Sequence, residues 1–181
     1  MQLTQCKSIE ASQVHRRSAL ALNQVDPPNR HSPEALPVGT SIRQALPSDA
    51  DAIHVLMRPF VMRRLLLSRT EAEIIELTRH GFVAVASGNN QASQIVGFSA
   101  IEVYSTKLAE LQCLAVHPHF QGSGVGRALV EHCVERAKAL KVMEILAISS
   151  SEAFLKNCGF DYALPDQKKA LFCNLRSRSH D

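Results

Sequence analysis

A glycine-rich loop between an apolar strand and a strongly periodic helix constrains the fold more than any other part of the chain. The apolar run at residues 111–116 ends at His117-Pro118, and residues 121–126 then read Gln-Gly-Ser-Gly-Val-Gly. From there to Leu140, apolar residues recur every three or four positions and charged residues occupy the positions between them. This period predicts an amphipathic helix, so the stretch is a strand, a loop and a helix in sequence.

Loops of this kind favour anions. Glycines ahead of a helix let the backbone adopt a positive φ and approach a ligand closely. The first amides of the helix have no partner within it, and the positive end of the helix dipole lies at the same place. A pyrophosphate would fit such a loop. A plain connection between strand and helix, with no ligand, is the alternative.

Two nucleotide-binding loops fit this sequence poorly. A P-loop ends in Gly-Lys-Ser or Gly-Lys-Thr, whereas Arg127-Ala128 follows Gly126 here. A dinucleotide fingerprint places an acidic residue about 20 positions after its glycines, and Glu144 lies near that distance. The glycines themselves stand at every second position from Gly122, which is not the fingerprint's spacing.

The same residues resemble a known family. The pattern Gln121-x-x-Gly124-x-Gly126, after a strand that ends Leu-Ala-Val-His-Pro at residues 114–118, resembles the acyl-CoA loop of the GNAT superfamily of N-acetyltransferases. Residues 154–160, Phe-Leu-Lys-Asn-Cys-Gly-Phe, are similar to the Gly-Phe signature after that family's fourth helix. The resemblance covers roughly residues 40–176.

Within the superfamily, two segments most resemble the acetyltransferase domain of N-acetylglutamate synthases. They are residues 109–118 and residues 164–169, which read Leu-Pro-Asp-Gln-Lys-Lys. The amino-acid kinase domain that such synthases often add is absent from these 181 residues.

The resemblance implies an α+β fold of the GNAT type, with a mixed, mostly antiparallel sheet flanked by helices, and acetyl-CoA as co-substrate. In the family, the main chain at the positions of Leu114, Ala115 and Val116 pairs with the pantetheine arm where neighbouring strands splay apart. A backbone N–H near Val116 would polarise the thioester carbonyl. The residues expected to bind the pyrophosphate are Gln121, Gly122, Ser123, Gly124, Val125, Gly126 and Arg127.

Glu110 is the candidate general base. Transfer to an amine requires a neutral nucleophile, so an ammonium group must first lose a proton. Some superfamily members place a general-base glutamate four residues before the position of Leu114. Strand alternation predicts that Glu110, Gln112 and Leu114 share one face, with Cys113 and Ala115 on the other. A glutamate on the surface or in a salt bridge is the alternative.

A side-chain general acid is not evident. Many family members use a tyrosine of the last helix to protonate the leaving thiolate, and Leu155 occupies that position here. Tyr162 lies two residues beyond Phe160 and is not expected to replace it. Water is the remaining proton donor.

Two arginines are candidates for binding a substrate carboxylate. The step Ser68-Arg69 resembles one beside the acceptor site of synthase-like members, and a planar guanidinium matches a carboxylate. Arg176 matches an arginine that contacts the amino-acid carboxylate at the end of such synthases. A surface arginine is the alternative for Arg69.

These residues favour an amino-acid acceptor, L-glutamate first, over a peptide, a protein or a polyamine. A polyamine enzyme would need carboxylates, which Glu71 and Glu73 could supply. A catalytically silent acyl-CoA-binding regulatory module is the rival class; it would bind acetyl-CoA and acetylate no acceptor.

The composition limits the classes of partner that the protein is expected to bind. A net charge of +3 with scattered Lys and Arg gives no nucleic-acid footprint. The five cysteines include no C-x-x-C pair, and His117 and His119 have no evident third ligand, so no metal site is expected. No apolar run reaches the length of a membrane span and no signal-peptide core is present. We therefore expect a cytoplasmic protein with a small-molecule acceptor, and a homodimer is an open alternative.

Domain organisation follows from composition as well. Residues 1–39 contain Pro27-Pro28, Pro33 and Pro37 among polar residues, which predicts a flexible N-terminal extension with at most a weak helix at 9–25. Residues 40–181 are expected to form the acetyltransferase domain. Its predicted strands are 40–45, 82–87, 94–104, 107–117, 143–149 and 171–175. The first predicted helix has Ser48 as its N-cap and an interruption near Pro59. The other predicted helices are 70–79, 125–140 and 151–158.

Overall fold

A computed structural model of the chain describes residues 36–87, 93–149 and 151–162. Apart from residues 36–39, the predicted N-terminal extension lies outside this part, as do the predicted strand at 171–175 and Arg176.

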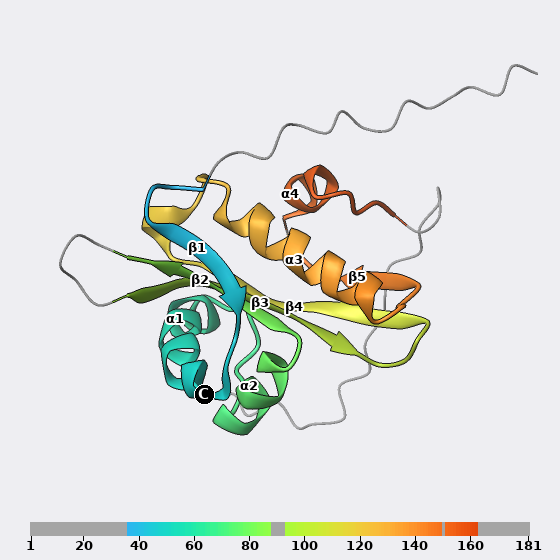
Figure 1. Ribbon diagram of the computed structural model, residues 1–181, viewed down its shortest axis with the longest axis horizontal. Coiled ribbons are helices and arrows are strands. Elements are labelled where there is room, and N and C mark those ends of the chain that lie inside the picture. The colour runs from blue at the N-terminus through green and yellow to red at the C-terminus, as the bar shows by residue number, and fades with distance from the viewer. Residues whose placement is uncertain (1–35, 88–92, 150, 163–181) are drawn as a thin grey trace, which may run out of the picture. The chain divides into compact units, whose positions relative to one another are not determined.

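The described residues form a five-stranded mixed sheet with helices on both faces (Figure 1). The strands are adjacent in the order in which the chain forms them. The first four pair antiparallel, and the fifth runs parallel to the fourth. This is the α+β architecture predicted from the sequence. The strands are β1 (Thr40–Gln44), β2 (Gly81–Ala86), β3 (Gln94–Val103), β4 (Leu108–Val116) and β5 (Glu144–Ala147).

The helices divide the core between the two faces of the sheet. One face packs against α1 (Ala50–Met62) and α2 (Glu71–Thr78), whose buried residues meet Phe98 and Ala115. The other face packs against α3 (Val125–Ala139) and α4 (Glu152–Asn157). Short 3-10 turns, Pro47–Asp49 and Pro118–Phe120, precede α1 and the glycine loop.

The start of α1 differs from the prediction. Ser48 is not its N-cap, because a 3-10 turn precedes the helix and Asp49 holds that turn. The Asp49 carboxylate accepts a hydrogen bond of 2.8 Å from the Leu46 N–H and bonds of 2.7 and 2.9 Å from the Arg43 guanidinium. With three donors, the charged Asp49 carboxylate is a stronger acceptor at this turn than the Ser48 hydroxyl. These contacts, the one with Arg43 first, lower the pKa of Asp49.

The interruption predicted near Pro59 is also wrong, since α1 continues through Pro59 to Met62. A proline removes only one donor from the ladder, and the last turn is closed by other bonds. Arg64 adopts a positive φ of 56°, and the N–H groups of Arg64 and Leu65 donate to the carbonyls of Val61 and Phe60 at 2.9 Å each. This is the left-handed helix ending usually made by glycine.

Gly97 allows α3 to lie close to the sheet. The pairing of β2 and β3 skips one residue beside it, since Ala84 faces Gly97 and Val85 faces Ile95, so a β-bulge lies next to Gly97. A Cβ atom at Gly97 would lie 2.9 Å from Leu129 Cδ1 and 3.1 Å from Ala84 Cβ. Only a residue without a side chain fits between the helix and its neighbouring strand.

We predict that Gly97→Ala lowers the free energy of unfolding by about 1–3 kcal/mol, because α3 must move off the sheet. Urea denaturation measures this. Gly126→Ala is the matched control, since a Cβ there meets only ordinary contacts at 3.5 Å or more. Equal stability of the two variants would contradict the close packing at Gly97.

Candidate active site

A β-bulge in β4 shapes the candidate site. Phe98 of β3 faces Ala115 and Ala100 faces Gln112, so Cys113 and Leu114 together oppose the single residue Ser99. Cys113 adopts a positive φ of 57°, which is uncommon for a residue with a side chain. The Ser99 hydroxyl donates to the Gln112 carbonyl at 3.3 Å. Such an extra residue bends a strand and increases its twist.

The bulge reverses the alternation of side chains along β4. Gln112 contacts Arg69, which lies just before α2, whereas Leu114 packs in the core beneath α3. The prediction that Gln112 and Leu114 share a face is therefore wrong. Cys113 and Ala115 do share one, in the core beneath α1 and α2. Contrary to the prediction, it is not the face opposite Gln112, because Gln112 pairs with Ala100 of the same core.

Strand β5 covers only the first half of the edge of β4 that faces away from β3. Its four residues pair with β4 only from Leu108 to Leu111. Beyond Leu111 this edge of β4 has no strand partner among the described residues, and a cavity of about 560 Å³ opens there. Four parts of the chain line the cavity, and these include β4 (Leu111, Cys113, Leu114, Val116), the end of α1 and the loop after it (Phe60, Leu65, Leu66), the glycine loop (Gln121, Gly122, Gly124, Gly126, Arg127), and the segment from β5 into α4 (Ile148, Ser149, Phe154, Leu155).

The glycine loop is fastened to the end of β4. The Gln121 Nε2 donates to the Val116 carbonyl at 2.9 Å, and the Ser123 hydroxyl donates to the Phe120 carbonyl at 2.6 Å. Gly122 and Gly124 have positive φ values of 75° and 84°, and α3 begins directly after Gly124. The first amides of this helix therefore lie at one end of the cavity, where they suit an anion.

Most of the predicted cofactor residues line this one cavity. Three do not: Ala115 and Val125 pack in the core, and Ser123 supports the loop through Phe120. An open strand edge, an apolar cleft and an anion-binding loop in a row suit a long ligand with a phosphate end, as acetyl-CoA is. The described residues therefore fit the co-substrate.

Arg69 lies over the face of β4 that carries the Gln112 side chain. Its Nη2 donates to Gln112 Oε1 at 2.6 Å, and its Nη1 lies 3.7 Å from a Glu73 carboxylate oxygen. The Nε atom is buried and has no hydrogen-bond partner among the described residues. Burial raises the pKa of the neighbouring Cys113 thiol, and the Arg69 charge acts against that shift.

Glu110 stands on the same face as Gln112, directly opposite Glu102 of β3. The Gln112 Nε2 donates to Glu102 Oε2 at 3.0 Å, and the Tyr104 hydroxyl donates to Glu110 Oε2. This bond to Glu110, together with burial, raises the pKa of Tyr104 to about 12. Glu110 itself does not line the cavity, although its neighbour Leu111 does.

Sequence reasoning missed Glu102 and Tyr104. The available signal was their spacing, since residues two positions apart at the end of a strand point to the same face. Their partners on β4 depend on the register of the β3–β4 pair, which the sequence did not indicate.

The histidines beside Pro118 belong to the loop. The His117 and His119 rings meet edge to face, with centroids 5.1 Å apart. No group of three or more His, Cys, Asp or Glu residues that could hold a metal ion occurs in the described part of the chain. None of its helices is long and apolar enough to cross a membrane.

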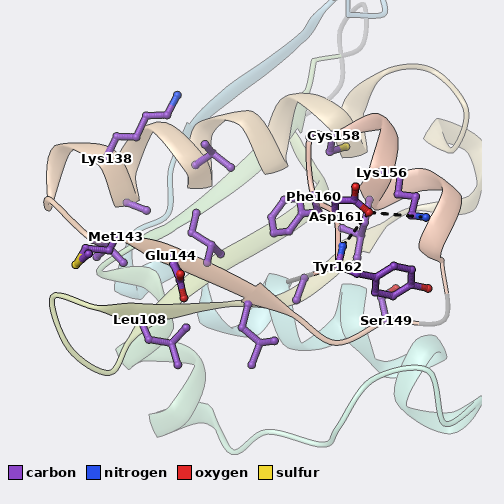
Figure 2. A pocket seen from close by; sticks show the side chains of 18 of the residues that line it. Leu108, Lys138, Met143, Glu144, Ser149, Lys156, Cys158, Phe160, Asp161 and Tyr162 are labelled. Carbon is purple, nitrogen blue, oxygen red and sulfur yellow. Dashed lines mark hydrogen bonds and ion pairs between the residues drawn. The ribbon is translucent and has the colours of Figure 1, made fainter. Parts of the chain in front are cut away.

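A second and larger cavity, of about 720 Å³, lies between the end of α3, β5 and α4 (Figure 2). Lys138 comes from α3, Glu144 from β5 and Lys156 from α4. Lys156 pairs with Asp161 at 3.8 Å and lies over the Tyr162 ring. No residue of the glycine loop lines this cavity, so size alone does not make it the candidate site.

Comparison with known proteins decides the family. The model of the acetyltransferase (GNAT) domain matches residues 78–162. An uncharacterized N-acetyltransferase of Chlorobaculum tepidum is 34% identical over 121 residues, which span 67% of this chain and 75% of that protein. The chain belongs to the GNAT acetyltransferases. It is an N-acetyltransferase that uses acetyl-CoA, as the resemblance implied.

Other relatives of this GNAT protein act on amino acids. The amino-acid acetyltransferase of Pasteurella multocida is 28% identical over 146 residues; the match spans 77% of this chain but only 32% of that protein. An N-acetylglutamate synthase of Neisseria gonorrhoeae, complexed with coenzyme A and N-acetyl-glutamate, is 25% identical with a TM-score of 0.58. The alignment covers 67% of this chain and 28% of that one. The predicted fold and family are thus confirmed.

We predict that the bulge tolerates no β-branched residue. Cys113→Val should lower the free energy of unfolding by about 1–2 kcal/mol more than Cys133→Val, because valine strongly disfavours a positive φ. Cys133 is a matched control, since it is equally a buried thiol but lies in the regular helix α3. Chemical denaturation compares the two variants, and equal losses would mean that the backbone at Cys113 is not constrained.

Proposed function

We propose that this GNAT protein acetylates the amino group of a free amino acid, with L-glutamate as the first candidate. One observation carries the proposal. Arg69 donates to Gln112, which lies two residues from Glu110 along β4 and on the same face of the sheet. A guanidinium that can bind a carboxylate lies near a base that can deprotonate an ammonium group. This arrangement suits the carboxylate and the amino group of one α-amino acid. The amino-acid acetyltransferases among the relatives support this choice.

For the co-substrate, we propose that the main chain of residues 114–116 binds the pantetheine arm at the open edge of β4. The amides of residues 121–127 would bind the pyrophosphate, since they combine positive-φ glycines with the start of a 15-residue helix. The thioester carbonyl would then lie near the Val116 N–H, which would stabilise negative charge on its oxygen.

The proposed reaction is direct transfer. Glu110 accepts a proton from the substrate ammonium group, directly or through a water molecule, and the neutral amine attacks the thioester carbonyl carbon. A carbon–nitrogen bond forms as the carbon–sulfur bond breaks, and the thiolate of CoA takes up a proton. Leu155 lines the cavity at the position of the family's tyrosine, so water supplies that proton.

A second candidate acceptor is a polyamine or another cationic amine. The observation that favours it is the set of carboxylates on this face, because Glu102 and Glu110 face each other and Glu73 lies beside Arg69. Such a face attracts positive charge. Arg176, the other proposed carboxylate-binding residue, lies outside the described residues and would shift the balance toward glutamate.

A panel of acceptors tests the substrate. We expect saturable acetylation of L-glutamate by the full-length protein with acetyl-CoA, followed by mass spectrometry of the acetylated product. Arg69→Ala should lower kcat/KM for glutamate about 10- to 100-fold, the value of hydrogen bonds to a charged group. Arg79→Ala is the control, since its side chain is 70% exposed and, among the described residues, pairs only with Glu76 at the surface.

Turnover of a polyamine in place of every amino acid would overturn the substrate and keep the mechanism. Binding of acetyl-CoA without turnover of any amine would favour the regulatory module instead.

We predict that Glu110→Gln lowers kcat roughly 100-fold or more, as expected for loss of a general base. Affinity for acetyl-CoA, measured by calorimetry, should stay unchanged because Glu110 does not line the cavity. Glu144→Gln is the control, as an exposed strand glutamate on β5. Unchanged turnover in Glu110→Gln would remove Glu110 from the mechanism.

A further inference from the structure

Tyr104 has a fixed place at the end of the β3–β4 hairpin. Its N–H donates to the Leu108 carbonyl at 3.1 Å, and the Met143 N–H donates to the Thr106 carbonyl at 3.0 Å. The turn after β3 is therefore tied both to β4 and to the start of β5. From this anchored backbone the Tyr104 side chain crosses to β4, where its hydroxyl donates to Glu110.

The surroundings of Glu110 explain why a donor matters there. Glu102 lies directly opposite on β3, and like charges in this position repel each other. Each carboxylate has its own donor, because Gln112 donates to Glu102 and Tyr104 donates to Glu110. The bond from Tyr104 uses Oε2, and the Glu110 carboxylate has no other hydrogen-bond partner among the described residues. Its Oε1 is thus left to accept a proton.

We propose that Tyr104 is a positioning residue that holds the Glu110 carboxylate in one orientation for proton transfer. This inference rests on the proposed role of Glu110 as base. The phenol remains a donor throughout the neutral range, since the Glu110 bond and burial raise the pKa of Tyr104 to about 12.

The contact is testable without knowledge of the acceptor. The chain contains two tyrosines and no tryptophan, so in a Tyr162→Phe background the near-ultraviolet absorbance of phenolate reports Tyr104 alone. We expect ionisation near pH 12, moving toward the ordinary value of 10.0 when Glu110→Gln is added. Circular dichroism at each pH verifies that the protein is folded. Ionisation of folded Tyr104 at its ordinary value with Glu110 intact would overturn the contact.

Kinetics test the positioning role, with the amine that gives the highest turnover in the panel. Tyr104→Phe should lower kcat about tenfold with little change in KM, the effect of losing one hydrogen bond to a charged group. Tyr162→Phe is a matched control, since Tyr162 and Tyr104 are 54% and 53% exposed.

The outcomes separate the two proposals. If Glu110→Gln is silent, the base assignment fails and the role of Tyr104 fails with it. If Glu110→Gln is slow but Tyr104→Phe matches the wild type in kcat, only the role of Tyr104 fails. Support requires that Tyr104→Phe has its effect in the wild type and none in the Glu110→Gln background.

Discussion

The extra residue in β4 is the constraint on which the site depends. Ser99 faces both Cys113 and Leu114, so the strand bends at the point where β5 stops pairing with it. The bend leaves a strand edge open toward the glycine loop, and the Gln121 bond to the Val116 carbonyl keeps the loop at the end of that edge. Cys113 accepts an unfavourable backbone conformation for this geometry.

The same bulge separates two chemical environments. Leu114 turns toward the core beneath α3, while Gln112 remains on the face where it meets Arg69. The co-substrate side is therefore apolar and bounded by glycines, and the acceptor side is charged. Glu102 and Glu110 would repel each other on that face, but the amide of Gln112 and the hydroxyl of Tyr104 each satisfy one of them. The proposed chemistry relies on this division.

Periodicity and turn residues were sufficient for most of the fold, because α3, β2 and β3 carry strong local patterns. The predictions at Ser48 and Pro59 were wrong because each relied on a local residue preference. The Asp49–Arg43 contact overrides the first, and the left-handed ending at Arg64 closes α1 after Pro59. Alternation failed at Leu114 because a bulge formed by Cys113 has no glycine to reveal it. Tyr104 was missed because its contact with Glu110 is set by strand register. The glycine loop was found because it needs glycine at Gly122 and Gly124, where φ is positive.

We propose that the open edge of β4 is the acyl-CoA cleft. Backbone hydrogen exchange with and without coenzyme A tests it most directly. The claim predicts that binding slows exchange at residues 114–116 and 122–127. Slowed exchange confined to residues 142–146 and 158–160, which line the larger cavity of Figure 2, would contradict it.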